Sequence, residues 1–233
     1  IYGDVRSGDF SVPIRQDLKA IAKHDLNASF GVMNDLKSWR RWYAVVNAAN
    51  IFLERIQEVK DNDQRYTNNN MVVDIAQARF LRAFAYFYMV RIWGDVPLIV
   101  ASKEGTFDDQ PREDQSKVMA FVEQELQKAA NDLPFLYSSN DPQQQGNYYN
   151  EYNSRWNGAL ARKTTAYAIL AHVAAWQSNY PDAAAYAKFV IDNQQKGSLG
   201  LIPTNNLTDP NGFFYDKNPN QLLGFGHIYN HVE

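Results

Sequence analysis

The chain has 233 residues, of which 45% are hydrophobic and 14% are aromatic, and its formal net charge is −3. This weakly acidic balance lacks the basic footprint of nucleic-acid-binding proteins, so we expect no nucleic acid partner. The sequence contains no cysteine, which excludes disulfides, thiolate metal sites and cysteine nucleophiles. It also lacks the uncharged apolar run of about 18 residues that marks a membrane span.

The N-terminal quarter is predicted to hold one long helix preceded by mostly irregular segments. Residues 1–12 are rich in turn-forming residues and predict an irregular lead-in. A short helix is expected from Pro13 to Ala22, and a loop over residues 23–35. From Leu36 to Lys60 apolar residues recur every three or four positions, which indicates a long helix. A polar loop over residues 61–70 follows it.

The most informative stretch is Ala76–Leu98, with the sequence AQARFLRAFAYFYMVRIWGDVPL. Up to Trp93 almost every position is apolar or aromatic on all sides of a helix, and such a helix is buried all round. Gly94 is expected to end the helix, because a helix commonly closes on a residue in a left-handed conformation. Pro97 cannot continue a helix. The sequence therefore predicts a central buried helix over residues 71–93.

Three arginines, Arg79, Arg82 and Arg91, interrupt this apolar helix. Arg79 and Arg82 are three positions apart and share one face. A buried charge without a partner is very costly, and this helix offers no carboxylate at a suitable spacing. We therefore expect structural ion pairs to other helices, for example to Glu54 or Glu58.

The same stretch resembles the signature helix of the SusD/RagB family, which comprises surface nutrient- and glycan-binding lipoproteins of Bacteroidetes-type outer membranes. The shared pattern includes the arginines, the aromatic run and the Gly-Asp-x-Pro exit. Gln77 stands where the family usually has Glu, and Trp93 where it often has Phe. The resemblance implies an all-α, tetratricopeptide-like helical-repeat fold with long irregular loops. It also implies that this chain is an N-terminal portion whose lipid anchor and second half lie outside it.

Downstream of this helix the pattern alternates between helices and long connections. Residues 94–111 are expected to be extended, Arg112–Leu133 helical, and residues 135–155 a long polar loop. Loops of this length are uncommon in compact domains and are often functional.

The next two predicted helices resemble a tetratricopeptide unit. They run from Trp156 to Gln177 and from Asp182 to about Gln194. Ala171 and Ala183 fall at the small positions that let paired helices pack closely, and Tyr180 falls in the turn between them. We expect these helices to complete a SusD-like helical-repeat domain over residues 1–196. The Gly- and Pro-rich residues 197–233 form an irregular segment that leads towards a missing C-terminal region, with a short strand from Leu222 to Tyr229.

Closely spaced tyrosines and amide side chains mark a candidate ligand site within residues 143–157. Sugars present flat C–H faces that stack on aromatic rings, while amides and carboxylates bond to sugar hydroxyls. An aromatic loop folded onto the repeat surface, or used in a protein interface, has a similar composition. The predicted ligand-binding residues are Tyr148, Tyr149, Tyr152, Trp156, Asn147 and Asn153, with Asn34 and Asp35 before the first long helix as further candidates.

Neither cofactor nor metal is expected, because the sequence carries no phosphate loop, nucleophile elbow or zinc motif. His227 and His231 could form a metal site only on a helix, and their Gly-rich segment does not predict one. His172 is predicted to be a packed core residue. The acids on the predicted helices are expected on solvated faces, which argues against a glycosidase pair. They are Glu54, Glu58, Glu113, Glu123 and Glu125.

The resemblance implies a non-catalytic receptor on the cell surface that captures glycan or oligosaccharide. It would pass the ligand to a SusC-like TonB-dependent transporter in the outer membrane and would be held there by its N-terminal lipid anchor. Two other classes stay open. A tetratricopeptide-type protein-interaction module would be favoured by an apolar or basic groove without an aromatic platform. An α-helical glycoside hydrolase would be shown by sugar release.

Overall fold

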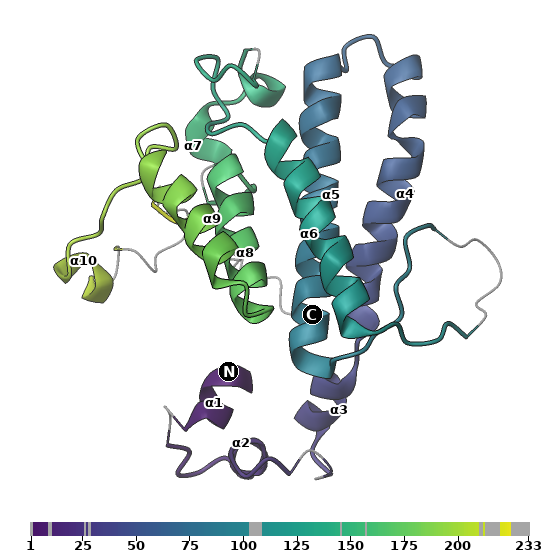
Figure 1. Ribbon diagram of the computed structural model, residues 1–233, viewed down its shortest axis with the longest axis vertical. Helices are drawn as coiled ribbons and strands as arrows, with labels where there is room; N and C mark the ends of the chain where they lie inside the picture. Colours follow the sequence, from purple (N-terminus) through teal and green to yellow (C-terminus); the bar gives the residue numbers. More distant parts are fainter. Residues whose placement is uncertain are drawn as a thin grey trace. The chain divides into compact units, whose positions relative to one another are not determined.

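The computed structural model confirms the all-α fold (Figure 1). It describes residues 2–8, 11–25, 27, 29–102, 109–144, 146–156, 158–209, 212 and 220–224. In these ranges extended pairing is limited to one isolated bridge, between Val96 and Glu113. None of the helices described has the length and apolar character needed to cross a membrane. The chain divides into two compact units, residues 1–43 and 44–233.

The first unit is more helical than the sequence predicted. Helix α1 (Tyr2–Ser7) occupies the expected lead-in over residues 1–12, and α3 (Gly31–Lys37) begins inside the expected loop over residues 23–35. Both predictions of irregular structure are therefore wrong for these parts. Helices of two turns carry too few apolar positions to establish a period, so their formation depends on packing.

That packing is a small core of the first unit. Val5 of α1 and Met33 of α3 are buried together with Ile21 of α2 (Gln16–Ala22). The short helix expected after Pro13 is thus present and begins three residues later. At α3 the N-cap residue Phe30 makes no side-chain capping bond, so the local sequence gave no start signal for this helix.

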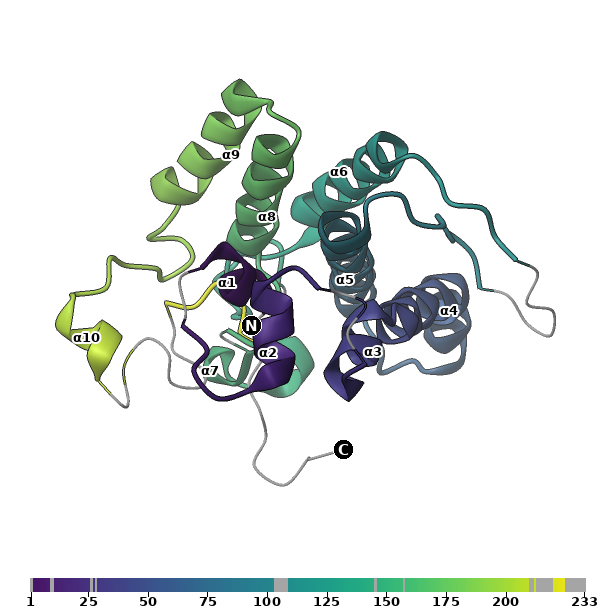
Figure 2. The same ribbon diagram turned by 90° about the horizontal axis from the view of Figure 1, so that it is seen from below.

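The second unit is a row of long helices that Figures 1 and 2 show from two sides. Helix α5 packs on α6, α6 on α8, and α8 on α9, while α4 runs along α5 in both views. The bounds of these helices are α4 (Arg40–Asn62), α5 (Asn68–Trp93), α6 (Gln115–Asp132), α8 (Lys163–Trp176) and α9 (Tyr180–Asp192). Each corresponds to a predicted helix, with shifts at the ends.

Capping explains two of those shifts. The Thr67 side chain accepts a hydrogen bond from the Asn70 backbone N–H at 3.0 Å, so α5 begins within the expected polar loop. Asp114 caps α6 in the same way, accepting from the Ser116 N–H at 2.8 Å. In both cases the helix begins at the residue that directly follows the capping residue.

Helix α5 ends as its sequence predicts. Gly94 has φ +70°, a backbone conformation that side chains with a Cβ rarely adopt, and its N–H donates to the Val90 carbonyl at 2.9 Å. The chain then runs without helix through Pro97 to the segment that packs beside Tyr86. Helix α5 is buried along most of its length, as expected for a helix that is apolar all round.

The segment before α8 contains the largest error of the helix predictions. A continuous helix from Trp156 is wrong, because Gly158 has φ +72° and interrupts it. The short helix α7 (Asn153–Trp156) precedes this turn, and η1 (Tyr148–Asn150) precedes α7. Helix α8 begins only after Arg162.

Helices α8 and α9 form the pair expected of a tetratricopeptide-like unit. The Asn179 side chain caps α9, and Pro181 lies in its first turn. Tyr180 is therefore the first residue of α9 rather than a residue of the turn. Ala171 and Ala183 line one groove between the two helices, as small residues at close-packing positions should.

Arg162 holds the chain after α9 against the start of α8. Its side chain is fully buried and donates to the Gly197 carbonyl at 2.7 Å and to the Gln221 carbonyl at 2.9 Å. The Thr165 hydroxyl donates to the Leu222 carbonyl at 2.7 Å. The boundary expected at residue 196 stays a prediction.

Of the strand expected from Leu222 to Tyr229, residues 222–224 are irregular and the rest lie outside the described residues. His227 and His231 also lie outside them. Searched over its described residues, the chain shows no group of His, Asp and Glu that could hold a metal ion.

Candidate functional site

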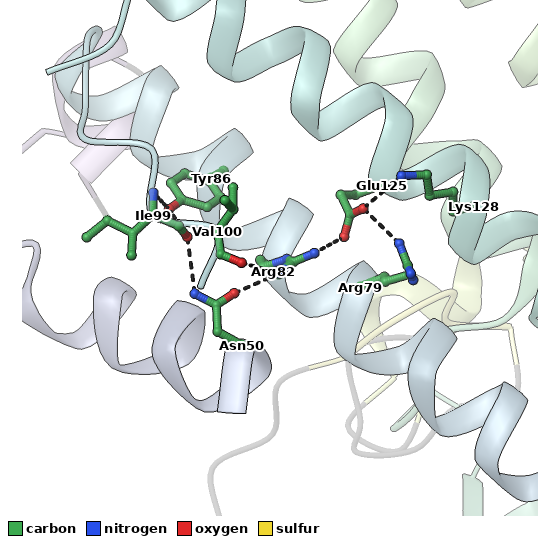
Figure 3. A network of polar contacts seen from close by, with 8 residues as sticks. All are labelled: Asn50, Arg79, Arg82, Tyr86, Ile99, Val100, Glu125 and Lys128. Atoms are coloured by element: carbon green, nitrogen blue, oxygen red, sulfur yellow. Dashed lines mark hydrogen bonds and ion pairs between the residues drawn. The ribbon is translucent and has the colours of Figure 1, made fainter. Parts of the chain in front are cut away.

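Arg79 and Arg82 of α5 belong to a buried ion-pair network rather than to an open pocket (Figure 3). Arg82 is 7% exposed, and its guanidinium contacts the carboxylate of Glu125 on α6. Arg79 Nη1 lies 2.9 Å from the other oxygen of Glu125, and Lys128 Nζ lies 3.5 Å from it. The second Arg82 nitrogen, Nη1, donates to Asn50 Oδ1 at 2.7 Å.

The partner of these arginines is therefore Glu125, rather than Glu54 or Glu58. The expectation that Glu125 lies on a solvated face is wrong, because its exposed fraction is 2%. The spacing of apolar residues along α6 does not by itself predict that Glu125 is buried, because a charged residue on a helix normally faces water. Only the packing of α5 on α6 makes it the counter-ion of two guanidiniums.

The network continues into the segment that follows α5. Asn50, a buried amide of α4, donates through its Nδ2 to the Ile99 carbonyl at 3.2 Å. The Tyr86 hydroxyl accepts from the Ile99 N–H at 2.7 Å and donates to the Ile99 carbonyl at 3.0 Å. Burial raises the pKa of Tyr86 to about 12. These contacts fix the path of residues 99–100, so the network has a structural role.

Asp74, the single carboxylate of α5, joins three elements near the start of this helix. Asp74 Oδ2 accepts hydrogen bonds from the hydroxyls of Tyr66 and Tyr149, both at 2.6 Å. Its Oδ1 accepts from the Tyr148 hydroxyl. Burial and then the bond to Asp74 raise the pKa of each of these three tyrosines. Asp74 thereby ties α5 to the α4–α5 connection and to residues 146–156, which we call the tyrosine loop.

Tyr148 is the core of this loop. It is 4% exposed, and its ring contacts Tyr137 at a centroid distance of 5.0 Å, Tyr149 at 4.7 Å and Trp156 at 5.3 Å. Aromatic contacts at these distances stabilise a packed cluster. The cluster holds the tyrosine loop against Val73 of α5.

Tyr149, by contrast, is 47% exposed and faces a polar pocket of about 400 Å³. Tyr149 and Asn150 have φ of +51° and +60°, so two successive residues are left-handed. Such a conformation costs of order 1 kcal/mol or more for a non-glycine residue and is common at functional sites. The polar pocket is lined by Asp63, Arg65, Tyr66, Thr67, Asn70, Gly146, Asn147, Tyr149 and Asn150.

An apolar groove of about 490 Å³ adjoins this pocket between α4 and α5. Tyr149 lines both hollows. The apolar groove is lined by Val45, Ala48, Ala49, Phe52, Asp74, Gln77, Ala78, Leu81, Tyr148, Tyr149 and Leu160.

The remaining predicted ligand residues line neither hollow. Tyr152 is 79% exposed, whereas Asn153 uses its Oδ1 to accept from the Tyr137 N–H at 3.0 Å. Trp156 is half-buried, and its Nε1 has no hydrogen-bond partner in the described part of the chain. Asn34 and Asp35 are exposed on α3 of the first unit, in a helix rather than in a loop.

Of the predicted ligand residues, Asn147 and Tyr149 thus line the polar pocket, and the residues that face them were not predicted. Asp63, Tyr66 and Asn70 lie in a segment that was assigned only as a polar loop. Asp74 could have been noticed, because a lone carboxylate at the start of a helix that is apolar all round needs a partner.

A third hollow lies on the α8–α9 pair and has a volume of about 430 Å³. His172 lines it and is exposed, so the prediction of a packed core histidine is wrong. The described lining contains no Trp, Tyr or Phe; it consists of Ala168, Ala171, His172, Ala175, Ala183, Ala187, Val190 and Ile191.

The raised pKa values predict an alkaline limit to stability. Unfolded tyrosines titrate near pH 10, whereas burial raises the pKa of Tyr66, Tyr86, Tyr137, Tyr148 and Tyr149. Above about pH 10 the folded state binds more protons than the unfolded state, so the free energy of unfolding falls as pH rises.

We expect part of the tyrosinate absorbance to appear only together with loss of helical circular dichroism. Ionisation of all tyrosines near pH 10 while the helices persist would contradict this account.

Fold and site together define a helical-repeat protein whose surface pocket is walled by tyrosine and amide side chains. Residues 19–174 match the SusD-like sequence family described as "Starch-binding associating with outer membrane". This chain belongs to that SusD-like family. The match includes both α5 and the tyrosine loop.

Individual relatives agree with the family assignment. SusD-like protein P2 of Formosa agariphila is 30% identical over 190 residues, which are 79% of this chain and 33% of that protein. A SusD superfamily protein of Bacteroides thetaiotaomicron, solved by crystallography, is 42% identical with a TM-score of 0.89, covering 96% of this chain and 49% of that one.

A further structure, solved with a xylogluco-oligosaccharide, is 25% identical with a TM-score of 0.58 and covers 79% of this chain and 34% of that one. The chain thus spans between a third and a half of the length of these relatives.

Proposed function

We propose that this chain is part of a non-catalytic carbohydrate receptor and that the polar pocket contributes to its binding site. The observation that supports this most directly is the pocket itself, in which a half-exposed tyrosine ring stands among three asparagines. Membership of the SusD-like family and the relative solved with a xylogluco-oligosaccharide support the same ligand class.

The chemistry of such a site needs no covalent step. The ring of Tyr149 offers a flat face to the C–H groups of a sugar, and its hydroxyl is already held by Asp74. The amides of Asn70, Asn147 and Asn150 can each donate to and accept from sugar hydroxyls. Because Asp74 already holds Tyr149 in place, this side chain loses little conformational entropy when a ligand binds.

Glu125 and Glu54, two of the acids that a hydrolase could use, are bound to other groups of the protein. Glu125 is shared by two arginines, and the Ser102 hydroxyl and N–H lower the pKa of the Glu54 carboxyl. A glycosidase needs one carboxylic acid with a raised pKa beside a carboxylate. These contacts favour a receptor over an α-helical glycoside hydrolase, and incubation with oligosaccharides should release no sugar.

The cellular location and the transporter partner that we propose are those implied by the SusD-like family. The full-length protein would be lipid-anchored at the outer-membrane surface and would hand its ligand to a SusC-like TonB-dependent transporter. Affinity purification of the full-length protein from membranes would then recover a TonB-dependent transporter.

A glycan array followed by calorimetry tests the binding site. We expect Tyr149→Ala to weaken binding of the selected glycan about tenfold, because an aromatic ring contributes on the order of 1 kcal/mol at such a contact. Tyr180→Ala, at a tyrosine of α9 that is 66% exposed, is the matched control and should leave affinity unchanged. Equal affinities for both variants would refute the assignment of the site.

A second candidate, the protein-interaction module, is favoured by the α8–α9 groove, because the described residues that line this groove are mostly apolar and include no aromatic ring. If that groove carried the function, Ala171→Arg would abolish binding of a protein partner and Tyr149→Ala would not. The comparison of these two variants in the same binding assay distinguishes the two functions.

A further inference from the structure

The polar pocket and the apolar groove share one lining residue, Tyr149. Tyr149 lines both, and its hydroxyl meets that of Tyr66, a wall of the polar pocket, at the same oxygen of Asp74. Figure 1 shows α4 and α5, which line the groove, as an antiparallel pair joined by a short connection. A ligand in the polar pocket therefore has an apolar surface directly beside it.

The apolar groove is open to solvent. Val45 is 40% exposed, Phe52 37% and Leu81 39%, although all three are large apolar residues. Such side chains normally lose water contact where they can, and a contiguous apolar hollow marks a binding surface more often than bare surface. The groove volume of about 490 Å³ is within the range of small-molecule sites.

The polar groups of the groove are already engaged with the protein. The carboxylate of Asp74 accepts tyrosine hydroxyls, and the amide of Gln77 donates to the Ala161 carbonyl at 2.7 Å and accepts from the Ala161 N–H at 3.2 Å. Sugar hydroxyls in the groove would therefore lose hydrogen bonds to water without replacement. An apolar group has no such cost.

We propose that this site takes an oligosaccharide that carries an aromatic substituent, as an aryl aglycone or an aromatic acyl ester. The sugar lies in the polar pocket, the substituent lies in the apolar groove, and the ring of Tyr149 contacts both. This inference rests on the proposed carbohydrate-binding function and adds the class of ligand. The adjoining position of the two hollows supports it, since a ligand of this kind needs one polar and one apolar compartment.

Calorimetry on the full chain with matched probe pairs tests the proposal. The probes are the methyl and the 4-nitrophenyl β-glycosides of cellobiose, xylobiose and laminaribiose. For the sugars that bind, we expect the nitrophenyl glycoside to bind about tenfold more tightly than its methyl counterpart, because the groove removes an aromatic ring from water.

Ala48→Phe fills the apolar groove from an exposed position of α4, so it should not disturb the core. We expect this variant to bind both members of a pair equally, with the affinity for the methyl glycoside unchanged. The matched control is Ala120→Phe at an exposed position of α6 that does not line the groove, and it should keep the tenfold preference.

The outcomes separate this inference from the function on which it rests. Equal binding of both glycosides by the unsubstituted chain overturns the inference and leaves the receptor function standing. A preference that survives Ala48→Phe overturns the inference as well, because the aromatic group would then bind elsewhere. If none of the probes and no glycan of the array binds, both proposals fall.

Discussion

Glu125→Gln is expected to lower the free energy of unfolding by about 3–5 kcal/mol, the largest effect that we predict for a single substitution. The variant keeps the shape of the side chain but removes its charge, and the guanidinium of Arg82, which is 7% exposed, is left without a carboxylate. Arg79 is 29% exposed at its side chain and can turn to water. Denaturant unfolding followed by circular dichroism measures the loss.

Glu58→Gln is the control for this prediction. Glu58 also pairs with an arginine, Arg55, but their side chains are 62% and 64% exposed. Exposed ion pairs contribute on the order of 0–1 kcal/mol, so we expect almost no change. Equal losses for the two variants would show that burial of Glu125 does not determine its contribution.

Asp74→Ala is expected to reduce both stability and ligand affinity. Tyr66 and Tyr148, which are 8% and 4% exposed, would lose the acceptor of their hydroxyl groups. A buried polar group without a partner costs roughly 1–3 kcal/mol, so the free energy of unfolding should fall by about 2–4 kcal/mol. Affinity for any glycan that the chain binds should fall about tenfold, because Tyr149 also loses its anchor.

Two controls separate position from charge in this experiment. Asp192→Ala removes an exposed carboxylate that pairs with Lys188 and should change neither quantity. Asp74→Asn keeps one acceptor oxygen and should be intermediate in both measurements. If Asp74→Ala lost stability but bound the glycan unchanged, then Asp74 would support the fold without positioning the binding wall.

The helices with strong periodic patterns were predictable, and the short ones were not. The apolar residues of α4 and α6 recur every three or four positions, which indicates a helix whatever its neighbours are. Helices α1 and α3 have about two turns each, so their formation depends on the shared core around Ile21 and Met33. Sequence patterns in so short a window carry little information on such packing.

At the candidate site the sequence indicated a loop that lines the polar pocket, but not the geometry of that loop. The alternation of tyrosine and asparagine predicted ligand-binding roles for Asn147 and Tyr149, and both residues line the polar pocket. The same alternation gave equal weight to Tyr148, which is buried, and to Asn153, which holds the backbone of Tyr137. Which side of a loop faces solvent depends on the surface on which the loop packs.

The sequence by itself determined the position and burial of the central helix, because one stretch contains enough local information, and the resemblance of that stretch to the SusD/RagB family implied the helical-repeat fold. An apolar run on every side of α5 requires burial, and Gly94 and Pro97 require the helix to end there. The tertiary structure decided which groups meet. Glu125 is 43 residues from Arg82, and Tyr149 is 75 residues from Asp74. Such pairs form only when helices pack, since no local pattern encodes the partner of a buried charge.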